Sequence, residues 1–290
     1  MGGTELPSTS GSPPAVLDGL RVGVAQVGAR VGDPTYNLRV ARRIIGRAAK
    51  RGASLVVFPE CYLHGYELGP HPASCSEPAD GPGPRALADL AGEHGVGIVA
   101  GFIESNESDP RHPWNSALVV DRDGRIAGVY RKTHLFGGEG AVFARADTYP
   151  VFDLHLRGSG QSLRIGVCIC VDIEYPEVPR LLALGGAQVL AIPSADMEPF
   201  RAQQASQLMA RAIENNVYVA LANTADRRPG VVFFGESGVA GPDGSLVGAG
   251  YLRPRLVVAE LHDRAVHASG GFGSYLRGRR PETYGALTRR

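Results

Sequence analysis

The sequence has little cysteine and no surplus of either charge. Four cysteines in 290 residues are too few for a disulfide framework, so we expect a reducing, cytoplasmic environment. An important cysteine there is more often catalytic or metal-binding than cross-linked. The formal net charge is +1, and without a basic surplus or an acidic tail nucleic acid is not an expected partner.

Long apolar runs are also missing from the chain. None approaches the roughly 18 residues that a membrane-spanning helix needs, and the first residues lack the charged and apolar regions of a signal peptide. We therefore expect no membrane partner. There is no repeat of about 20–50 residues either, which argues against a solenoid or a propeller.

What is present is an ordinary globular composition. Apolar residues make up 43% of the chain and charged residues 20%, enough apolar material for a sizeable core. Residues 1–17 are rich in Gly, Ser, Thr and Pro and are predicted to be a disordered leader. Residues 18–290 are expected to form one domain, with a C-terminal tail from about residue 262.

Hydrophobic periodicity predicts strands and helices in alternation. Two hairpins are also predicted, turning at Asp123-Gly124 and Asp243-Gly244, whereas residues 65–84 contain too much Gly and Pro for a regular element. This order predicts an α/β domain with a mixed sheet or two packed sheets covered by helices. The predicted strands are 21–27, 54–58, 96–102, 163–170, 187–193 and 217–223, and the predicted helices are 37–52, 85–95, 176–186 and 200–216.

Three predicted strand ends carry a reactive side chain. Glu60 follows the strand at 54–58, Lys132 closes the second strand of the first hairpin, and Cys170 closes the strand at 163–170. Ligands of α/β sheets bind at such ends. Singly, each residue fits a solvated loop position or an inert core filler. Together they form a chemical set, because Glu60 can deprotonate a thiol while Lys132 lowers its pKa or stabilises an oxyanion.

The two cysteines of "GVCICVD" have different predicted roles. Residues two apart on a strand point to the same face, so alternation does not separate Cys168 from Cys170. Cys168 lies within the predicted strand and is expected to fill the core, whereas Cys170 at its end is the candidate nucleophile. A metal or redox pair would need both thiols exposed together.

A cysteine- and histidine-containing loop and His134 are further candidate functional groups. A zinc site could be built from one loop, but its spacing matches no common zinc template, so no metal is predicted. His134, beside Lys132, is interpreted as a structural histidine and not as a second base. The candidate zinc ligands are Cys61, His64, His71 and Cys75.

The segments "FPE", "YRKTHL" and "ICVDIEYPE" occur in the order and context of the nitrilase superfamily of carbon–nitrogen hydrolases. Flanking segments such as "GVAQVGARVGDPTYNL", "MARAIENNVYVALAN" and "RGRRPETY" resemble the same family. The resemblance extends from about residue 20 to residue 284. It implies a single-domain, four-layer α-β-β-α sandwich and no cofactor. It also implies a homodimer or higher homo-oligomer, in which the tail around "RRPETY" often crosses to the partner.

By the same resemblance, Glu60 is the general base, Lys132 the charge stabiliser and Cys170 the nucleophile that forms a thioester. Glu139 matches a second glutamate that many members place near the substrate. With Lys132, the backbone N–H of Val171 would hold the oxyanion. The substrate would be a small molecule with a carbon–nitrogen bond outside a peptide.

Residues after the nucleophile favour an amide over a nitrile. Nitrile-cleaving members often have Trp-Glu after the cysteine, whereas Val171-Asp172 is closer to the pattern of amidases and carbamoylases. The segment "PSADMEPF" resembles the corresponding amidase segment, which would place Ser194 and Ala195 near the nucleophile.

The substrate class rests on one departure from the family pattern. Many relatives carry Arg where this chain has Glu174, and Glu would repel the carboxylate that Arg clamps. We therefore expect a neutral or cationic substrate, unless Glu174 faces away and pairs with a surface arginine such as Arg180.

Tyr66 either contacts substrate or packs beneath its loop. The alternatives that remain are hydrolysis of a carbamoyl (ureido) compound or a nitrile, acyl transfer, and a catalytically inactive binding protein of the same fold.

Overall fold

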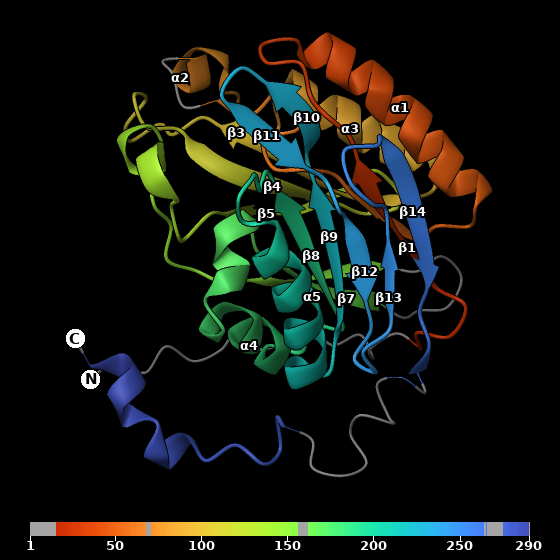
Figure 1. The fold of residues 1–290 in the computed structure, drawn as a ribbon. Helices are drawn as coiled ribbons and strands as arrows, with labels where there is room; N and C mark the ends of the chain where they lie inside the picture. Colours follow the sequence, from red (N-terminus) through yellow and green to blue (C-terminus); the bar gives the residue numbers. More distant parts are fainter. Residues whose placement is uncertain (1–15, 68–70, 156–161, 264, 266–274, 290) are drawn as a thin grey trace.

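The computed structural model describes residues 16–67, 71–155, 162–263, 265 and 275–289. Two six-stranded sheets form the centre of the molecule (Figure 1). Within the first sheet, the three strands at its centre, β1, β2 and β3, run parallel, and the flanking strands are antiparallel. Its spatial order is β14 (Arg255–Glu260), β1 (Arg21–Gln26), β2 (Leu55–Val57), β3 (Gly97–Glu104), β4 (Trp114–Val120) and β5 (Ile126–Arg131).

The second sheet repeats this arrangement. Its strands β7, β8 and β9 are parallel, and its flanking strands are antiparallel. A separate two-stranded ribbon, β10 (Ala225–Arg228) with β11 (Val231–Phe234), follows β9. The spatial order of the second sheet is β13 (Leu246–Gly248), β12 (Gly238–Ala240), β9 (Tyr218–Asn223), β8 (Val189–Ser194), β7 (Ser162–Val167) and β6 (Val151–His155).

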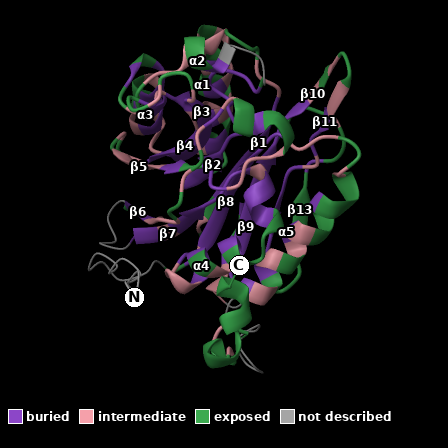
Figure 2. Cartoon of the chain, turned by 90° about the vertical axis from the view of Figure 1, so that its left-hand side faces the viewer, coloured by how far each residue is buried: buried purple, intermediate pink, exposed green. Residues whose placement is uncertain are grey.

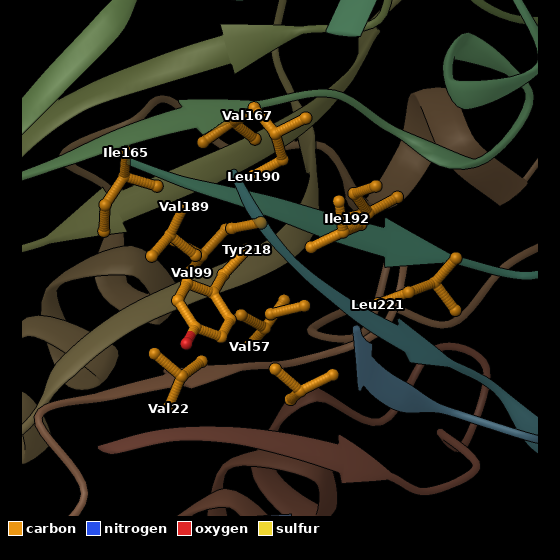
Figure 3. Packing of buried hydrophobic residues seen from close by; sticks show 14 of the residues in the cluster. Val22, Val57, Val99, Ile165, Val167, Val189, Leu190, Ile192, Tyr218 and Leu221 are labelled. Carbon is orange, nitrogen blue, oxygen red and sulfur yellow. The ribbon is translucent and has the colours of Figure 1, made fainter. Parts of the chain in front are cut away.

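Alternation along the strands explains how the layers stack. In β2, Leu55 and Val57 belong to the core between the sheets, whereas Val56 belongs to the core beneath helices α1 (Pro34–Lys50) and α3 (Pro82–His94). Neighbouring strand residues point to opposite faces, so each sheet has one face toward its partner sheet and one toward helices. Figure 3 shows side chains of both sheets meeting in this central core.

The outer face of the second sheet carries α4 (Glu177–Leu184) and α5 (Arg201–Asn215) (Figure 1). Leu182 of α4 and Leu208 of α5 are buried there. The layers are therefore helix, sheet, sheet and helix, as the resemblance implied. Figure 2 shows the buried strands at the centre, and the exposed turns of the tail, Pro281–Thr283 and Gly285–Thr288, outside them. Within the part of the chain that the structure describes, no helix combines the length and apolar character needed to cross a lipid bilayer.

Most predicted elements are present, and both predicted hairpins are confirmed as antiparallel pairs. The prediction of an irregular segment at 65–84 is wrong in part. A short helix, α2 (His71–Cys75), lies within it, and α3 already begins at Pro82. Proline suits the first turn of a helix, where its missing N–H is not needed, so its presence there did not exclude a helix.

The described chain begins at Val16, within the segment that composition assigned to the leader. Leu17 is 2% exposed and belongs to the central core, and its backbone N–H donates to Asp263 Oδ1 at 3.0 Å. Burial of the Leu17 side chain and this hydrogen bond of its backbone hold the residue against the domain. Residues 1–15 lie outside the described residues, as do parts of the predicted tail.

Candidate active site

A buried group of three charges lies at the centre of the candidate site. Lys132 Nζ lies 2.6 Å from Glu60 Oε1 and 2.9 Å from a carboxylate oxygen of Glu139. All three side chains are fully buried. Buried charges are tolerated when they are paired and hydrogen-bonded, so the two carboxylates and the ammonium depend on one another.

Neutral groups complete the hydrogen bonding of the two carboxylates. Asn115 Nδ2, at the start of β4, donates to Glu60 Oε1 at 2.7 Å and to Glu139 Oε1 at 3.4 Å. The Ala195 N–H, just after β8, donates to Glu60 Oε2 at 3.0 Å. The Tyr66 hydroxyl donates to Glu139 Oε1 at 3.0 Å. The carboxylates are therefore held from both sheets and from the loop after β2.

Local backbone geometry brings these residues together. The chain after β2 packs against Gly101 of β3, where a Cβ would lie 2.6 Å from Glu60 Cα and would also overlap Pro59 and Cys61. Only glycine permits this approach. On the other side, the Lys132 N–H donates to the Asn115 carbonyl at 2.8 Å, which extends the pairing of β4 and β5 by one residue.

Burial and charge set the protonation of this group. Burial raises the pKa of Glu60, and the nearby Glu139 carboxylate raises it further against the opposing effect of Lys132. Burial alone would lower the pKa of Lys132, but the two carboxylates raise it well above its usual value. Lys132 thus stays charged, while Glu60 becomes a stronger base than an exposed glutamate.

Cys170 lies in a turn and not at the end of the strand. Strand β7 ends at Val167, and residues Cys170–Glu174 form a short 3-10 turn. Cys170 has a φ of 48°, which a strand cannot accommodate and which few residues other than glycine adopt. The prediction that Cys170 closes the strand is therefore wrong by three residues. Such strained positions cluster at functional sites.

The pKa of the Cys170 thiol is raised well above its ordinary value. Burial is the main cause, the Glu60 carboxylate adds to it, and Lys132 only partly opposes it. Lys132 thus acts in the expected direction but does not produce a free thiolate. Cys168 is fully buried in the central core, and all four cysteines are free thiols.

Asp172 joins the turn of Cys170 to the chain after β5. Its Oδ2 accepts from the Ile169 N–H at 2.9 Å and from the Tyr130 hydroxyl at 2.7 Å. Its Oδ1 accepts from the Thr133 hydroxyl and the His134 N–H, both at 2.9 Å. One fully buried carboxylate thereby fixes the turn of Cys170 relative to the segment that carries Lys132.

Cys170 lines a small, narrow pocket. The buried ion-pair group of Glu60, Lys132 and Glu139 is not part of this lining. Aromatic, apolar and acidic side chains form the walls. The lining residues are Tyr66, Phe136, Cys170, Val171, Glu174, Ala195, Asp196, Met197 and Phe200.

The structure therefore brings most of the predicted site residues together, with one exception. Ser194 is buried and does not line the pocket. Its carbonyl instead accepts from the Glu60 N–H at 3.4 Å and from the Thr224 N–H at 3.0 Å. Glu174 faces the pocket, while Arg180 donates to the Glu214 carbonyl at 2.8 Å.

Sequence analysis missed several residues of the site. Asn115 and Asp172 supply hydrogen bonds, and Phe136, Asp196 and Phe200 line the pocket. Asp196 had a visible signal, because it follows Ala195 in the segment "PSADMEPF". Asn115 had none, since a polar residue at a strand start is most often solvated.

Two of the candidate zinc ligands, His64 and Cys61, have hydrogen-bond partners within the protein. His64 accepts from the Ile103 N–H at Nδ1, 3.0 Å, so its Nε2 carries the proton and donates to Glu77 Oε1 at 2.9 Å. Cys61 lies 3.5 Å from Asn115 Oδ1. No cluster of three or more metal-binding side chains occurs among the residues whose side chains the structure describes; that of His71 is outside them. His134 contacts Asp172 and stacks on Tyr175 at 3.9 Å.

The chain belongs to the carbon–nitrogen hydrolase family, whose sequence model matches residues 21–266. This range covers the fold and every site residue described above. The resemblance seen in the short motifs is thus confirmed over most of the chain. The protein is accordingly a hydrolase of the nitrilase superfamily, with amidases among its relatives.

Individual relatives support the same class. The chain is 34% identical over 274 residues to "Hydrolase in pqqF 5'region" of Pseudomonas protegens, covering 93% of each chain. It is 34% identical over 263 residues to an (R)-stereoselective amidase of Pseudomonas sp., covering 90% of this chain and 92% of the relative.

A solved structure of a glutamate-to-glutamine mutant of an amidase from Nesterenkonia sp. AN1 has the same fold, with a TM-score of 0.79. The two are 28% identical, and the match covers 94% of this chain and 98% of that one. In that structure, the acetamide moiety of fluoroacetamide is covalently added at the active site cysteine. The similar protein thus uses a cysteine within this fold.

Proposed function

We propose that this hydrolase cleaves the carbon–nitrogen bond of a small, neutral or cationic amide through a Glu60-Lys132-Cys170 triad. The observation that carries the proposal is the buried ion pair of Lys132 with Glu60, 2.6 Å, next to a pocket lined by Cys170. A buried pair of opposite charges is costly to build. Its position beside the thiol supports a role in catalysis.

The thiol reacts with Glu60 as its base. Because the pKa of Cys170 is raised, the proton passes to the Glu60 carboxylate as the sulfur attacks the amide carbon. The carbonyl oxygen takes up the negative charge, which Lys132 Nζ and the Val171 N–H stabilise. Glu60 then gives the proton to the departing amine, the carbon–nitrogen bond breaks, and a thioester remains.

Hydrolysis of the thioester reverses these roles. Glu60 takes a proton from water as the oxygen attacks the thioester carbon. The carbon–sulfur bond then breaks, the proton returns to Cys170, and the carboxylic acid leaves. Glu139 holds Lys132 from its other side at 2.9 Å, which supports a role in positioning the ammonium throughout the cycle. No step needs a cofactor.

The nucleophile is tested with the two neighbouring cysteines. Cys170→Ala is expected to abolish amide hydrolysis, and the protein should lose its covalent acyl adduct in mass spectrometry of acid-quenched reactions. Cys168→Ala is the matched control, since this thiol lies in the core. It should keep both the adduct and hydrolysis. Adduct formation at Cys168, or unchanged hydrolysis by Cys170→Ala, would contradict the triad and favour a binding protein of the same fold.

The substrate class is tested by comparing a simple carboxamide, an N-carbamoyl amino acid and a nitrile. We expect the carboxamide to be hydrolysed fastest, because Glu174 and Asp196 line the pocket and repel a carboxylate. A faster reaction with the N-carbamoyl amino acid or the nitrile would replace the amidase assignment. Adding hydroxylamine as an acceptor tests whether acyl transfer competes with hydrolysis.

We also propose that the protein forms a homodimer through the α4 and α5 face. Leu181 of α4 and Ile213 of α5 are 37% and 38% exposed, and Tyr175 nearby is 44% exposed. An apolar surface of this kind supports burial by a second copy. Light scattering of the purified protein tests this, and Ile213→Glu should shift a dimer toward monomer. A monomeric wild-type protein would contradict the proposal.

A further inference from the structure

Two carboxylates line the same pocket as the nucleophile. Glu174 ends the turn that begins at Cys170, and Asp196 follows strand β8 two residues after its last residue. They come from different elements of the second sheet and share one cavity. Their position relative to Cys170 places them where the non-reacting part of a substrate would lie.

Neither carboxylate is in direct contact with a basic side chain within the described part of the chain, although the Lys132 ammonium acts on Glu174 from a greater distance. No ion pair joins Glu174 or Asp196 to an arginine, lysine or histidine there. Arg211, which lies close to Glu174, donates instead to the carbonyls of Ile173 and Glu174 at 2.9 and 3.0 Å. The Arg211 guanidinium thus binds the backbone of this turn and makes no ion pair with the Glu174 carboxylate.

Asp196 is fixed in place by its backbone and its neighbours. Its N–H donates to Asn223 Oδ1 at 2.8 Å, and its carbonyl accepts from Asn223 Nδ2 at 3.1 Å. The Met197 N–H donates to Asp196 Oδ1 at 2.9 Å. The carboxylate is therefore preorganised, which lowers the cost of binding a ligand.

The surroundings of Asp196 favour its neutral, protonated form over its charged form. Burial raises its pKa to about 7, and the carboxylates of Glu174, Glu60 and Glu198 contribute to the shift. A positive charge in the pocket would reverse this effect, because an opposite charge within about 4–6 Å favours the ionised form.

The remaining walls also suit a cation with an apolar stem. Phe136 and Phe200 meet edge to face, with ring centroids 5.7 Å apart and planes at 84°, and Met197 lies beside them in the lining. Aromatic rings attract ammonium and guanidinium groups through their faces, while methylene groups pack on apolar side chains.

We propose that Asp196 and Glu174 form an anionic subsite that selects amides carrying an ammonium or guanidinium group on the part of the substrate away from the scissile bond. This inference rests on the proposed amidase activity and narrows its neutral or cationic substrates to cationic ones. Asp196 and Glu174 are specificity-determining residues in this scheme, and take no part in the proton transfers of Glu60 and Cys170.

The test uses three amides of similar length and different charge: γ-aminobutyramide, valeramide and succinamate. The wild-type protein is expected to prefer γ-aminobutyramide over valeramide by about 10- to 100-fold in kcat/KM, the range expected for one or two hydrogen bonds to charged groups. The difference should lie mainly in KM. Succinamate should be the poorest substrate. Equal values for the first two, or a preference for succinamate, would overturn the inference.

Variants assign the preference to the two carboxylates. Asp196→Asn and Glu174→Gln should each reduce the ratio of kcat/KM for γ-aminobutyramide over valeramide by about 3- to 10-fold. Glu174→Arg should improve succinamate relative to γ-aminobutyramide, a gain that misfolding could not produce. Glu198→Gln is the matched control, since this exposed carboxylate on the same loop does not line the pocket. An unchanged ratio in both Asp196→Asn and Glu174→Gln would contradict the assignment.

A binding measurement separates this inference from the proposed activity. Calorimetry with Cys170→Ala needs no turnover and should show tighter binding of γ-aminobutyramide than of valeramide. If the wild type hydrolyses valeramide but neither rate nor binding responds to charge, the subsite is wrong and the amidase proposal stands. If no amide is hydrolysed while the cation still binds more tightly and depends on Asp196, the subsite stands and the activity is wrong.

Discussion

Two pairs of carboxylates near Cys170 illustrate opposite solutions to the same electrostatic problem. Glu60 and Glu139 share the Lys132 ammonium at 2.6 and 2.9 Å and are fully buried. Glu174 and Asp196 line the pocket and form no ion pair with a basic side chain of the described part of the chain. The charges of the first pair are balanced within the protein, whereas a cationic ligand would balance those of the second pair under the inference above. The first pair is fully buried and depends on Lys132, whereas Glu174 is exposed and Asp196 is half-buried, so solvent or a ligand can reach the second pair.

The largest effect is expected from removing the ammonium of the first pair. Lys132→Met leaves two buried carboxylates facing each other, which typically costs about 3–5 kcal/mol of stability, and removes the proposed oxyanion stabiliser. We expect a loss of at least about 100-fold in kcat, with a lower midpoint of urea unfolding. Lys50, exposed at the end of α1, is the one other lysine of the chain. Lys50→Met should leave both measurements close to wild type.

A smaller effect is expected from adding a charge to the first pair. Asn115→Asp replaces a donor to Glu60 and Glu139 with a third carboxylate, which raises the pKa of Glu60 further. Activity at pH 7 should fall by about 10- to 100-fold, and part of it should return at higher pH. Kinetics across pH test this. Asn106→Asp, on the loop after β3, is the control, and a similar pH shift in that variant would contradict a local effect.

The pH dependence of the wild type gives a direct measure of the first pair. Glu60 must be ionised to act as a base, and its pKa is raised by burial. Activity on valeramide should therefore fall as pH decreases through a value above the ordinary glutamate pKa of about 4.3. A profile of kcat/KM measures this limb. If kcat/KM instead falls with an apparent pKa equal to that of an ordinary glutamate, Glu60 is not the group that controls the reaction.

The smallest effect concerns the second pair. The pKa of Asp196 is raised to about 7, so the carboxylate gains its charge as pH rises through this value. KM for γ-aminobutyramide should fall by several-fold over that interval, while KM for valeramide changes less. Glu174, Glu60, Glu198 and Cys170 are the other titratable groups facing Asp196.

The control for this prediction is Asp196→Asn, in which the difference between the two substrates across pH 7 should disappear. The same loss in Glu198→Gln would assign the titration to the wrong carboxylate. Because the test compares two substrates on one protein, a general loss of activity does not obscure it.

Sequence patterns predicted most strands and hairpins of the fold, but not the detailed contacts of the candidate site. Both results have a physical reason. Alternating apolar residues in segments such as 54–58 reveal a strand, and Asp-Gly turns reveal hairpins, because both are local properties. The nearness of Glu60, Lys132 and Cys170 depends on strands from two sheets, and the family motifs suggested it where periodicity could not. The left-handed backbone at Cys170 and the bond of Asn115 to Glu60 had no local signal.

The four bonds of Asp172 have a consequence for how this enzyme could change. They fix the turn of Cys170 to the Lys132 segment without using any residue of 193–200. The proposed reaction centre and residues 196–200 of the proposed subsite therefore lie in different parts of the chain, which meet where the Ala195 N–H and the Ser194 carbonyl contact Glu60. Glu174, in contrast, belongs to the turn of Cys170. If the proposed subsite is right, exchanging the side chains at 196–200 while the backbone of Ser194 and Ala195 keeps its place would alter specificity, whereas a change at Glu174 would also act on the turn of Cys170.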